Sequence, residues 1–312
     1  MQLITQTTHF SLDKPSVVAI GKFDGVHRGH KKLLKEVLEY REKGLQAVVF
    51  TFDPPPNVLF GEGEWKEITL QNEKRSIFKE MGMDVLIEFP LNRQSAATEP
   101  EDFIRNLLVG QMKARQIVAG VDVSFGNKGR GDGRLLKNLA KELEYGVSLI
   151  DKICYNGREI SSTYVREEII RGNMETVEKL LGEPYFISGT VVHGKRLGRT
   201  IGMPTANLTV SEEKLLPPNG VYYSFVYIEG KRYKGITNIG TKPTVSSKGQ
   251  PGGETYIYDF CEDIYGKEIK VELLAFKRPE MNFGTVEALK MQMEKDIAEG
   301  AVFQRTMEGQ GL

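Results

Sequence analysis

The sequence has no excess of either charge, few cysteines and no long apolar run. Lys and Arg together number 42, as do Asp and Glu, so the formal net charge is zero. A general nucleic-acid binder usually carries a basic excess, so the balance disfavours that class and favours a small-molecule ligand held by local charges. Cys154 and Cys261 show neither metal-binding spacing nor a disulfide framework, and we expect two reduced, partly buried thiols.

The N-terminal segment Met1–Pro15 is polar and lacks the apolar core of a signal peptide. No apolar run reaches the length of a membrane span. These features predict a cytoplasmic protein that binds neither membrane nor nucleic acid. Its 312 residues, 40% of them apolar and 27% charged, are typical of two globular domains.

Short apolar runs alternate with amphipathic stretches in the first half of the chain. This alternation predicts a doubly wound α/β domain, a parallel sheet with helices on both faces and ligands at the carboxyl ends of its strands. The predicted strands are 16–21, 45–52, 84–89, 116–123 and 147–153, and the predicted helices are 31–43, 73–81, 100–112 and 134–145.

Two further helices are expected before the pattern changes. Ser161 or Ser162 is positioned to cap the first, Asn173 to cap the second, and Gly182 followed by Pro184 to end it. We therefore predict one domain over residues 1–183 and another over residues 184–312.

The sequence of the second domain predicts closely spaced strands, and these indicate a six-stranded antiparallel barrel. Glu229-Gly230 marks a tight hairpin turn between two of them, and Thr285 is positioned to cap a terminal helix over 286–299. The predicted strands are 186–192, 206–210, 221–228, 231–237, 254–260 and 269–276.

The segment from Gly21 to His30 joins a predicted buried strand to a predicted helix. Glycines such as Gly25 and Gly29 let the backbone approach a phosphate, and a helix N-terminus favours an anion. His27 and His30, three residues apart, are placed to donate hydrogen bonds to charge growing on an α-phosphate. Two surface histidines at a helix cap, or a zinc site, are the competing interpretations.

Two later segments offer partners for this site. A glycine-rich basic loop over 120–132, with Asp122 near its start, suits a phosphate or a ring edge, although a solvated loop is the plain alternative. A hydroxyl-rich helix start ending in a cation suits an outgoing pyrophosphate, and a simple capping segment is its alternative. That helix start comprises Ser161, Ser162, Thr163 and Arg166.

The second domain contains its own phosphate-binding pattern. Thr205 and Asn207 lie two apart on a predicted strand and offer hard oxygen ligands for magnesium. Glu254 opens another predicted strand and is the candidate base for deprotonating an accepting hydroxyl, unless it is a surface glutamate. Before them comes a glycine-rich basic loop that could cradle a triphosphate and includes Gly194, Lys195, Gly198 and Gly202.

The first segment resembles the Gly-x-x-His-x-Gly-His motif of the nucleotidylyltransferase superfamily. Its longer string, Phe-Asp-Gly-Val-His-x-Gly-His, is similar to that of the prokaryotic bifunctional riboflavin kinase/FAD synthetases. The resemblance implies phosphorylation of riboflavin to FMN and adenylylation of FMN to FAD, with ATP and magnesium. It also implies that Gly21 and Phe23 take part in ATP binding.

Other strings carry the same resemblance. The 120–132 loop is similar to Gly-x-Asp/Asn-Phe-x-Phe-Gly, and 161–166 to Ser-Ser-Thr-x-x-Arg. In the second half, Gly-Lys-x-Leu-Gly, Gly-x-Pro-Thr-Ala-Asn, Glu-Thr-Tyr-Ile-x-Asp-Phe and Arg278-Pro279-Glu280 match the riboflavin kinase pattern. So does Asn238-Ile239-Gly240 with Pro243-Thr244. The match implies that Asn238 and Arg278 bind the flavin.

Two positions depart from the family pattern. Ser124 stands where arginine is frequent, and Pro55 stands where the family usually has histidine. A riboflavin kinase with weak or lost adenylyl transfer therefore remains an alternative, against which His27, His30 and Arg166 argue. The other alternative is a non-catalytic flavin- or nucleotide-binding regulator, against which Thr205, Asn207 and Glu254 argue.

Overall fold

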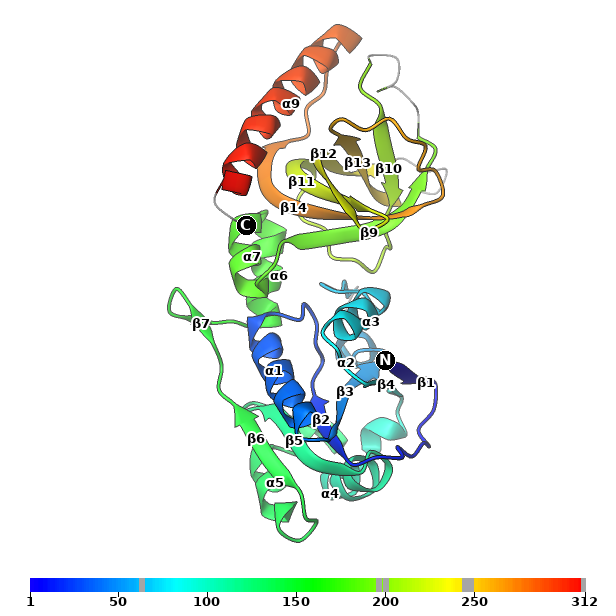
Figure 1. The fold of residues 1–312 in the computed structure, drawn as a ribbon, viewed down its shortest axis with the longest axis vertical. Helices are drawn as coiled ribbons and strands as arrows, with labels where there is room; N and C mark the ends of the chain where they lie inside the picture. Colours follow the sequence, from blue (N-terminus) through cyan, green and yellow to red (C-terminus); the bar gives the residue numbers. More distant parts are fainter. Residues whose placement is uncertain (62–64, 195–197, 199–201, 243–249, 310–312) are drawn as a thin grey trace. The chain divides into compact units, whose positions relative to one another are not determined.

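The computed structural model describes residues 1–61, 65–194, 198, 202–242 and 250–309. The chain divides into two compact units, Met1–Ser162 and Thr163–Leu312. Figure 1 shows that each unit has its own kind of sheet. This division rests on contacts within the fold and does not test the domain boundary predicted at residue 184, which stays a prediction.

The first unit contains a six-stranded sheet in the order β1-β4-β3-β2-β5-β6, with all neighbours parallel. The predicted parallel sheet is confirmed, and the order reverses beside β2, where doubly wound sheets bind ligands. The edge strand β1 was not predicted because it is short and half exposed. The strands are β1 (Gln2–Thr5), β2 (Ser16–Ile20), β3 (Gln46–Asp53), β4 (Val85–Pro90), β5 (Ala114–Gly120) and β6 (Gly146–Ile150).

Helices cover both faces of this sheet, and β2 shows why. Val17 and Ala19 face a core formed with α1 (Arg28–Glu42) and α3 (Gln71–Glu80). Val18 and Ile20 face a second core. Because successive strand residues point to opposite faces, a strand buried on both sides reads as a continuous apolar run. The doubly wound class is confirmed.

The second core is covered by helical segments whose limits differ from those predicted. The single helix expected over 100–112 is a short α4 (Pro100–Asp102) that continues as a π-helix, η2 (Phe103–Gln111). The helix expected to reach residue 145 is α5 (Gly133–Ala140). Smaller elements complete the unit: α2 (Pro56–Phe60), η1 (Ser95–Ala97), η3 (Asn127–Gly129), β7 (Cys154–Tyr155) and β8 (Arg158–Glu159).

Two helices precede the barrel, α6 (Ser162–Arg171) and α7 (Met174–Leu181). Gly182 ends α7 in the left-handed conformation, as predicted. Asn173 occupies the N-cap position of α7, but its side chain makes no capping bond and instead donates to Glu168 Oε2 at 2.7 Å. The capping role predicted for Asn173 is therefore wrong.

The second unit contains the predicted antiparallel barrel, closed in the order β10-β13-β12-β11-β14-β9. Glu229 and Gly230 join β11 to β12 with φ values of 49° and 80°, which confirms the predicted hairpin turn. The strands are β9 (Tyr185–Val192), β10 (Thr205–Thr209), β11 (Gly220–Ile228), β12 (Lys231–Lys242), β13 (Gln250–Ile257) and β14 (Glu268–Pro279).

The last helix, α9 (Val286–Gly309), packs on the outer face of the barrel. Thr285 caps it as predicted, because the Thr285 Oγ1 accepts from the backbone N–H of Ala288. The helix continues past the predicted end at residue 299, where the buried Gln304 donates to two barrel carbonyls. None of the described helices is long and apolar enough to cross a membrane.

Both cysteines are more exposed than predicted. Cys154 lies in the small β7–β8 hairpin and Cys261 in the segment after β13, and both are exposed. The prediction of partly buried thiols is wrong, because neither residue belongs to an element that packs on a core.

Candidate active sites

The turn between β2 and α1 has an unusual backbone. Phe23, Gly25 and Val26 all have positive φ values, 51°, 84° and 39°. Bulky residues rarely adopt this conformation, and it persists only where packing over-determines it. Phe23 and Val26 are fully buried, and the Phe23 ring packs edge-on against Phe78. Packing of these buried side chains therefore holds the turn in this conformation.

Three glycines of this segment make room for neighbouring side chains. A Cβ on Gly21 would lie 2.9 Å from the Phe23 ring, and one on Gly29 would lie 3.1 Å from the His27 ring. A Cβ on Gly25 would lie 3.3 Å from Ile68. The predicted glycine positions therefore admit packed side chains next to the turn, in addition to any approach of a phosphate.

His27 and His30 lie together at the N-terminus of α1. Their rings stack with centroids 3.8 Å apart and an interplanar angle of 17°. His27 is the N-cap residue, and its Nδ1 accepts from the backbone N–H of His30 at 3.4 Å. The prediction that the two histidines share one side of the helix start is confirmed.

Burial keeps both imidazoles uncharged. It lowers the pKa of His27 to about 4, against the opposing effect of the Asp122 carboxylate. Burial, and next the proximity of His27, lower the pKa of His30 well below its usual range. Because His27 Nδ1 accepts a hydrogen bond, we place its proton on Nε2. The pair therefore offers neutral N–H donors, while the buried His30 Nδ1 has no hydrogen-bond partner among the described residues.

Asp122 lies in the turn after β5, at the same sheet edge as the histidines. Its carboxylate is 3.2 Å from Lys152 Nζ, which also lies 2.8 Å from Glu159. Lys152 was not singled out from the sequence. Its signal is its place just after β6, because the ends of neighbouring parallel strands meet at one edge.

The glycine-rich loop after Asp122 is anchored by a residue that the sequence did not highlight. Arg130 Nη2 lies 2.7 Å from both Glu99 carboxylate oxygens, and Asn127 Nδ2 donates to the same carboxylate at 3.1 Å. These hydrogen bonds fix the loop to Glu99. Glu99 precedes α4, far away in sequence, so local reasoning had no means of pairing it with the loop.

The hydroxyl-rich segment begins at the turn of the first site. Ser162 Oγ donates to the backbone carbonyl of Asp24 at 2.7 Å, which ties this segment to the turn. Ser161 lies directly before α6. Thr163 and Arg166 belong to α6 within the second unit, so their part in this site stays a prediction.

Pro55, the position where the family usually has histidine, starts a helix here. It is the N-cap of α2, and its carbonyl accepts from the backbone N–H of Val58 at 2.8 Å. The carboxyl end of β3 is therefore followed by a helix-starting proline.

The second site is arranged by strand register. Glu254 lies within β13 rather than at its start, so the prediction that it opens the strand is wrong. It is directly opposite Asn207 on β10 and opposite Asn238 on β12. Asn238 in turn lies opposite Val221, which lies opposite Arg278. Residues directly opposite one another in a sheet present their side chains on the same face. Register alone therefore brings four of the predicted site residues into one row.

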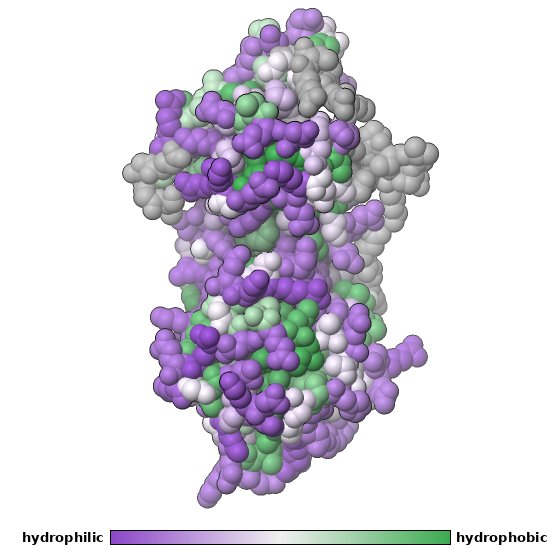
Figure 2. All heavy atoms as spheres, turned by 45° about the vertical axis from the view of Figure 1, so that its right-hand side comes forward, coloured by the Kyte–Doolittle hydropathy of each residue, from purple (hydrophilic) through white to green (hydrophobic). Residues whose placement is uncertain are grey.

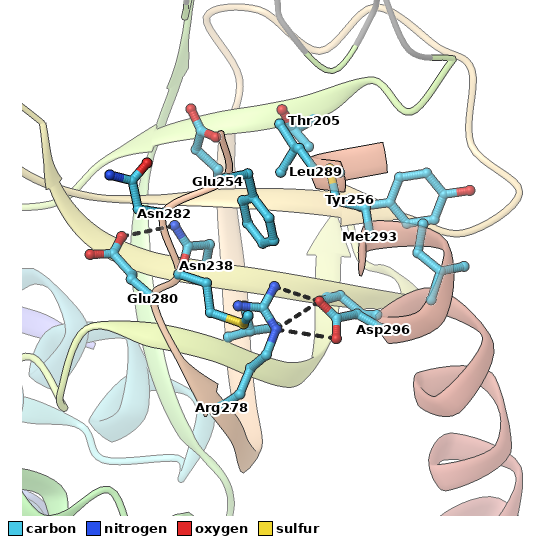
Figure 3. Close-up of a pocket in the computed structure, with 15 residues that line it drawn as sticks. Thr205, Asn238, Glu254, Tyr256, Arg278, Glu280, Asn282, Leu289, Met293 and Asp296 are labelled. Carbon is cyan, nitrogen blue, oxygen red and sulfur yellow. Dashed lines mark hydrogen bonds and ion pairs between the residues drawn. The ribbon is translucent and has the colours of Figure 1, made fainter. Parts of the chain in front are cut away.

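A cavity of about 580 Å³ lies on this face. Figure 3 shows it between the barrel strands, the segment after β14 and α9. Four predicted residues line it: Thr205, Asn238, Glu254 and Arg278. The other lining residues are Val221, Ile236, Tyr256, Glu280, Met281, Asn282, Phe283, Leu289, Met293, Asp296 and Ile297.

Asn207 belongs to the row although it does not line the cavity. Its side chain is buried, and a Cβ on Gly194 would lie 2.5 Å from its amide oxygen. Gly198 accepts from the backbone N–H of Met203 at 2.8 Å, and Gly202 has a positive φ of 81°. The predicted Lys195, and the Pro243-Thr244 string, lie outside the described residues.

Three charged or polar partners in this site were missed. Asp296 accepts from Arg278 Nε at 3.0 Å and Nη2 at 2.6 Å, and Gln292 donates to Asp296 at 2.9 Å. Glu280 accepts from Asn238 Nδ2 at 3.1 Å. Asp296 and Gln292 lie on α9, and no sequence motif links a helix face to a residue of β14.

The oxygen ligands suit magnesium better than zinc. Thr205 and Asn207 lie on one face of β10 next to the Glu254 carboxylate, and magnesium takes hydroxyl, amide, carboxylate and phosphate oxygens. No cluster of three His, Cys, Asp or Glu residues placed to hold a metal occurs in the described part of the chain. The residues present therefore fit a magnesium ion shared with a nucleotide.

Comparisons with known proteins agree along the whole chain. The sequence model described as FAD synthetase matches residues 9–164, and the one described as riboflavin kinase matches residues 181–303. A "Bifunctional riboflavin kinase/FMN adenylyltransferase" from Listeria monocytogenes is 37% identical over 307 residues, covering 97% of this chain and 96% of the relative. The protein of that name from Bacillus subtilis is 38% identical over 293 residues, covering 91% of each.

A solved structure shares the fold. A crystal structure described as a macrolide-efflux protein from Streptococcus pneumoniae superposes with a TM-score of 0.85 at 31% identity. The match covers 95% of this chain and 97% of that one. Both units therefore occur together in a solved relative.

Proposed function

The chain belongs to the bifunctional riboflavin kinase/FMN adenylyltransferase family, and we propose that it phosphorylates riboflavin to FMN in the barrel unit and adenylylates FMN to FAD in the parallel-sheet unit. The single observation that supports this best is the row Asn207, Glu254, Asn238, which joins a carboxylate and two amides across three strands beside a cavity.

In the kinase reaction the terminal ribityl hydroxyl of riboflavin attacks the γ-phosphorus of ATP and ADP leaves. Glu254 is proposed to accept the proton that the hydroxyl loses. Asn238 and Arg278 line the cavity where the flavin would lie. Gly194, Lys195, Gly198 and Gly202 are proposed to surround the nucleotide phosphates.

Magnesium is proposed as the metal of this site. Thr205 and Asn207 would hold it through their side-chain oxygens, and it would neutralise charge on the ATP phosphates. The role of this chain's own residues is to fix those oxygens on one strand beside Glu254.

In the adenylyl-transfer reaction a phosphate oxygen of FMN attacks the α-phosphorus of ATP and pyrophosphate leaves. FMN supplies its own nucleophile, so positioning and charge stabilisation suffice. The neutral N–H donors of His27 and His30 are proposed to stabilise the charge growing on the α-phosphate. The turn of Gly21, Phe23, Gly25 and Gly29 would hold the nucleotide with Asp122, and Ser161, Ser162, Thr163 and Arg166 would hold the pyrophosphate.

A riboflavin kinase with weak adenylyl transfer is the second candidate. The observation that favours it is Pro55, which starts α2 where the family usually has an imidazole. A cytoplasmic location and the absence of a nucleic-acid partner stay predictions from composition.

The experiment is an incubation of the protein with riboflavin, ATP and magnesium, with FMN and FAD separated by chromatography. FAD should form after FMN. Accumulation of FMN without FAD would favour the second candidate, and no conversion would favour a non-catalytic regulator.

A further inference from the structure

The charged side chains that line the kinase cavity are not balanced. Of the described lining residues, Glu254, Glu280 and Asp296 carry carboxylates, whereas Arg278 carries the one guanidinium. The Arg278 guanidinium is already paired, because its Nε and Nη2 both donate to Asp296, which is almost fully buried. Arg278 therefore offers a ligand hydrogen bonds but little net positive charge.

Arg278 has further features of a residue that contacts a neutral ring. Its Nη1 donates to the carbonyl of Pro279 at 3.1 Å, so part of each terminal nitrogen is already engaged. Its guanidinium lies 5.9 Å from the centre of the Phe283 ring. A planar guanidinium beside an aromatic ring suits an uncharged aromatic ligand with carbonyl acceptors.

Glu280 adds a carboxylate close to the proposed reaction point. It lies at the exposed rim and accepts from Asn238, which is directly opposite Glu254 in the strand register. Figure 3 shows Asn238 between the two carboxylates. Among the described residues Glu280 forms no ion pair, and its hydrogen bond to Asn238 holds its carboxylate beside the residue that lies opposite Glu254.

We propose that Glu280 is a specificity-determining residue, whose charge makes the kinase cavity accept uncharged riboflavin and repel the phosphate of FMN. This inference rests on the proposed kinase function. FMN carries about two negative charges on its phosphate at neutral pH, whereas riboflavin carries none. The reaction itself thus creates the repulsion, and the product leaves for a reaction that consumes a phosphate-bearing flavin.

The test measures the initial rate of ADP release from riboflavin and ATP by the full chain, with FMN added as inhibitor. ADP arises from the kinase step alone, since adenylyl transfer releases pyrophosphate. For Glu280→Gln we expect the ratio of the FMN inhibition constant to the riboflavin KM to fall about tenfold at low salt.

Two variants separate charge from structure. Glu280→Asp keeps the charge, and its FMN inhibition constant should stay within about twofold of the wild-type value. Glu268→Gln removes an exposed carboxylate from the opposite end of β14 and should change neither constant. Raising salt from roughly 50 to roughly 500 mM should strengthen FMN inhibition of the wild type more than that of Glu280→Gln.

The proposal is overturned if Glu280→Gln leaves FMN inhibition unchanged, or if it alters the riboflavin and FMN constants by the same factor. It is also overturned if Glu280→Asp matches Glu280→Gln, because loss of the bond to Asn238 would then explain both. A wild-type protein that releases no ADP with riboflavin contradicts the proposed function instead, so the two failures are distinguishable.

Discussion

The proposed adenylyl-transfer site centres on ten consecutive residues, Gly21 to His30, whereas the proposed kinase cavity has side chains from β10 to β14 and α9. In the first site a strained, buried turn places two stacked histidines at a helix start. In the second, strand register places residues far apart in sequence in one row. The first site should thus respond to changes in local backbone and burial, and the second to single side chains at register positions.

Replacing Glu254, the proposed base, should produce the largest difference between the rates of the two reactions. Glu254→Gln removes the proton acceptor, so we expect FMN formation to fall about 10³-fold while conversion of supplied FMN to FAD stays within about twofold. Chromatography of each reaction measures both rates. Glu262→Gln, an exposed change in the same unit, is the control, and a joint loss of both reactions in Glu254→Gln would contradict the division of labour.

His30→Ala should produce the opposite pattern. Removing a donor to developing charge typically costs about 10²- to 10³-fold, so FAD formation should fall by that factor and FMN formation should not. His9→Ala removes an exposed histidine from the same unit and should change neither rate. A His30→Ala protein that still makes FAD at the wild-type rate would remove the stacked pair from the mechanism.

The unfolding free energy of the first unit should depend on pH, because burial lowers the pKa of His27. The pKa of His27 is about 4 in the folded state and about 6.5 in an unfolded chain. Below pH 6.5 the unfolded state therefore binds more protons, and stability falls as the pH falls towards 4. Between pH 6.5 and pH 5, His27 should account for a loss of up to about 2 kcal/mol.

Urea unfolding followed by tryptophan fluorescence measures this effect in the correct unit, because the single tryptophan, Trp65, lies in the first one. His27→Gln should flatten the pH dependence by about 2 kcal/mol over that range. Equal slopes for the two proteins would show that burial does not suppress protonation of His27.

The smallest expected effect tests the strained turn. Gly25 and Gly44 both have positive φ, 84° and 95°, but only a Cβ on Gly25 would meet a neighbour, Ile68 at 3.3 Å. Each change to alanine should cost about 1 kcal/mol of unfolding free energy from backbone strain. Gly25→Ala should cost more and should slow FAD formation, whereas Gly44→Ala should leave activity intact. Indistinguishable variants would mean that the turn is not tightly packed.

Local patterns in the sequence were enough for the elements and the motifs. Continuous apolar runs predicted the parallel strands, alternation and turns predicted the barrel, and the glycine and histidine spacing located the first site. Partners from distant segments were not predictable in this way. Glu99, Lys152 and Asp296 reach their partners through tertiary packing, and their own surroundings in sequence carry no signal for it.

The sequence by itself determined that the chain has one α/β unit and one β unit, and that His27 and His30 stand at the start of a helix. Those properties depend on residue periodicity and local spacing. Tertiary structure alone decided that His27 is buried and both imidazoles are uncharged, that Arg278 is neutralised by Asp296, and that Glu280 lies beside Asn238. Burial and charge depend on which distant residues pack together, and that is set only when the strands and helices assemble.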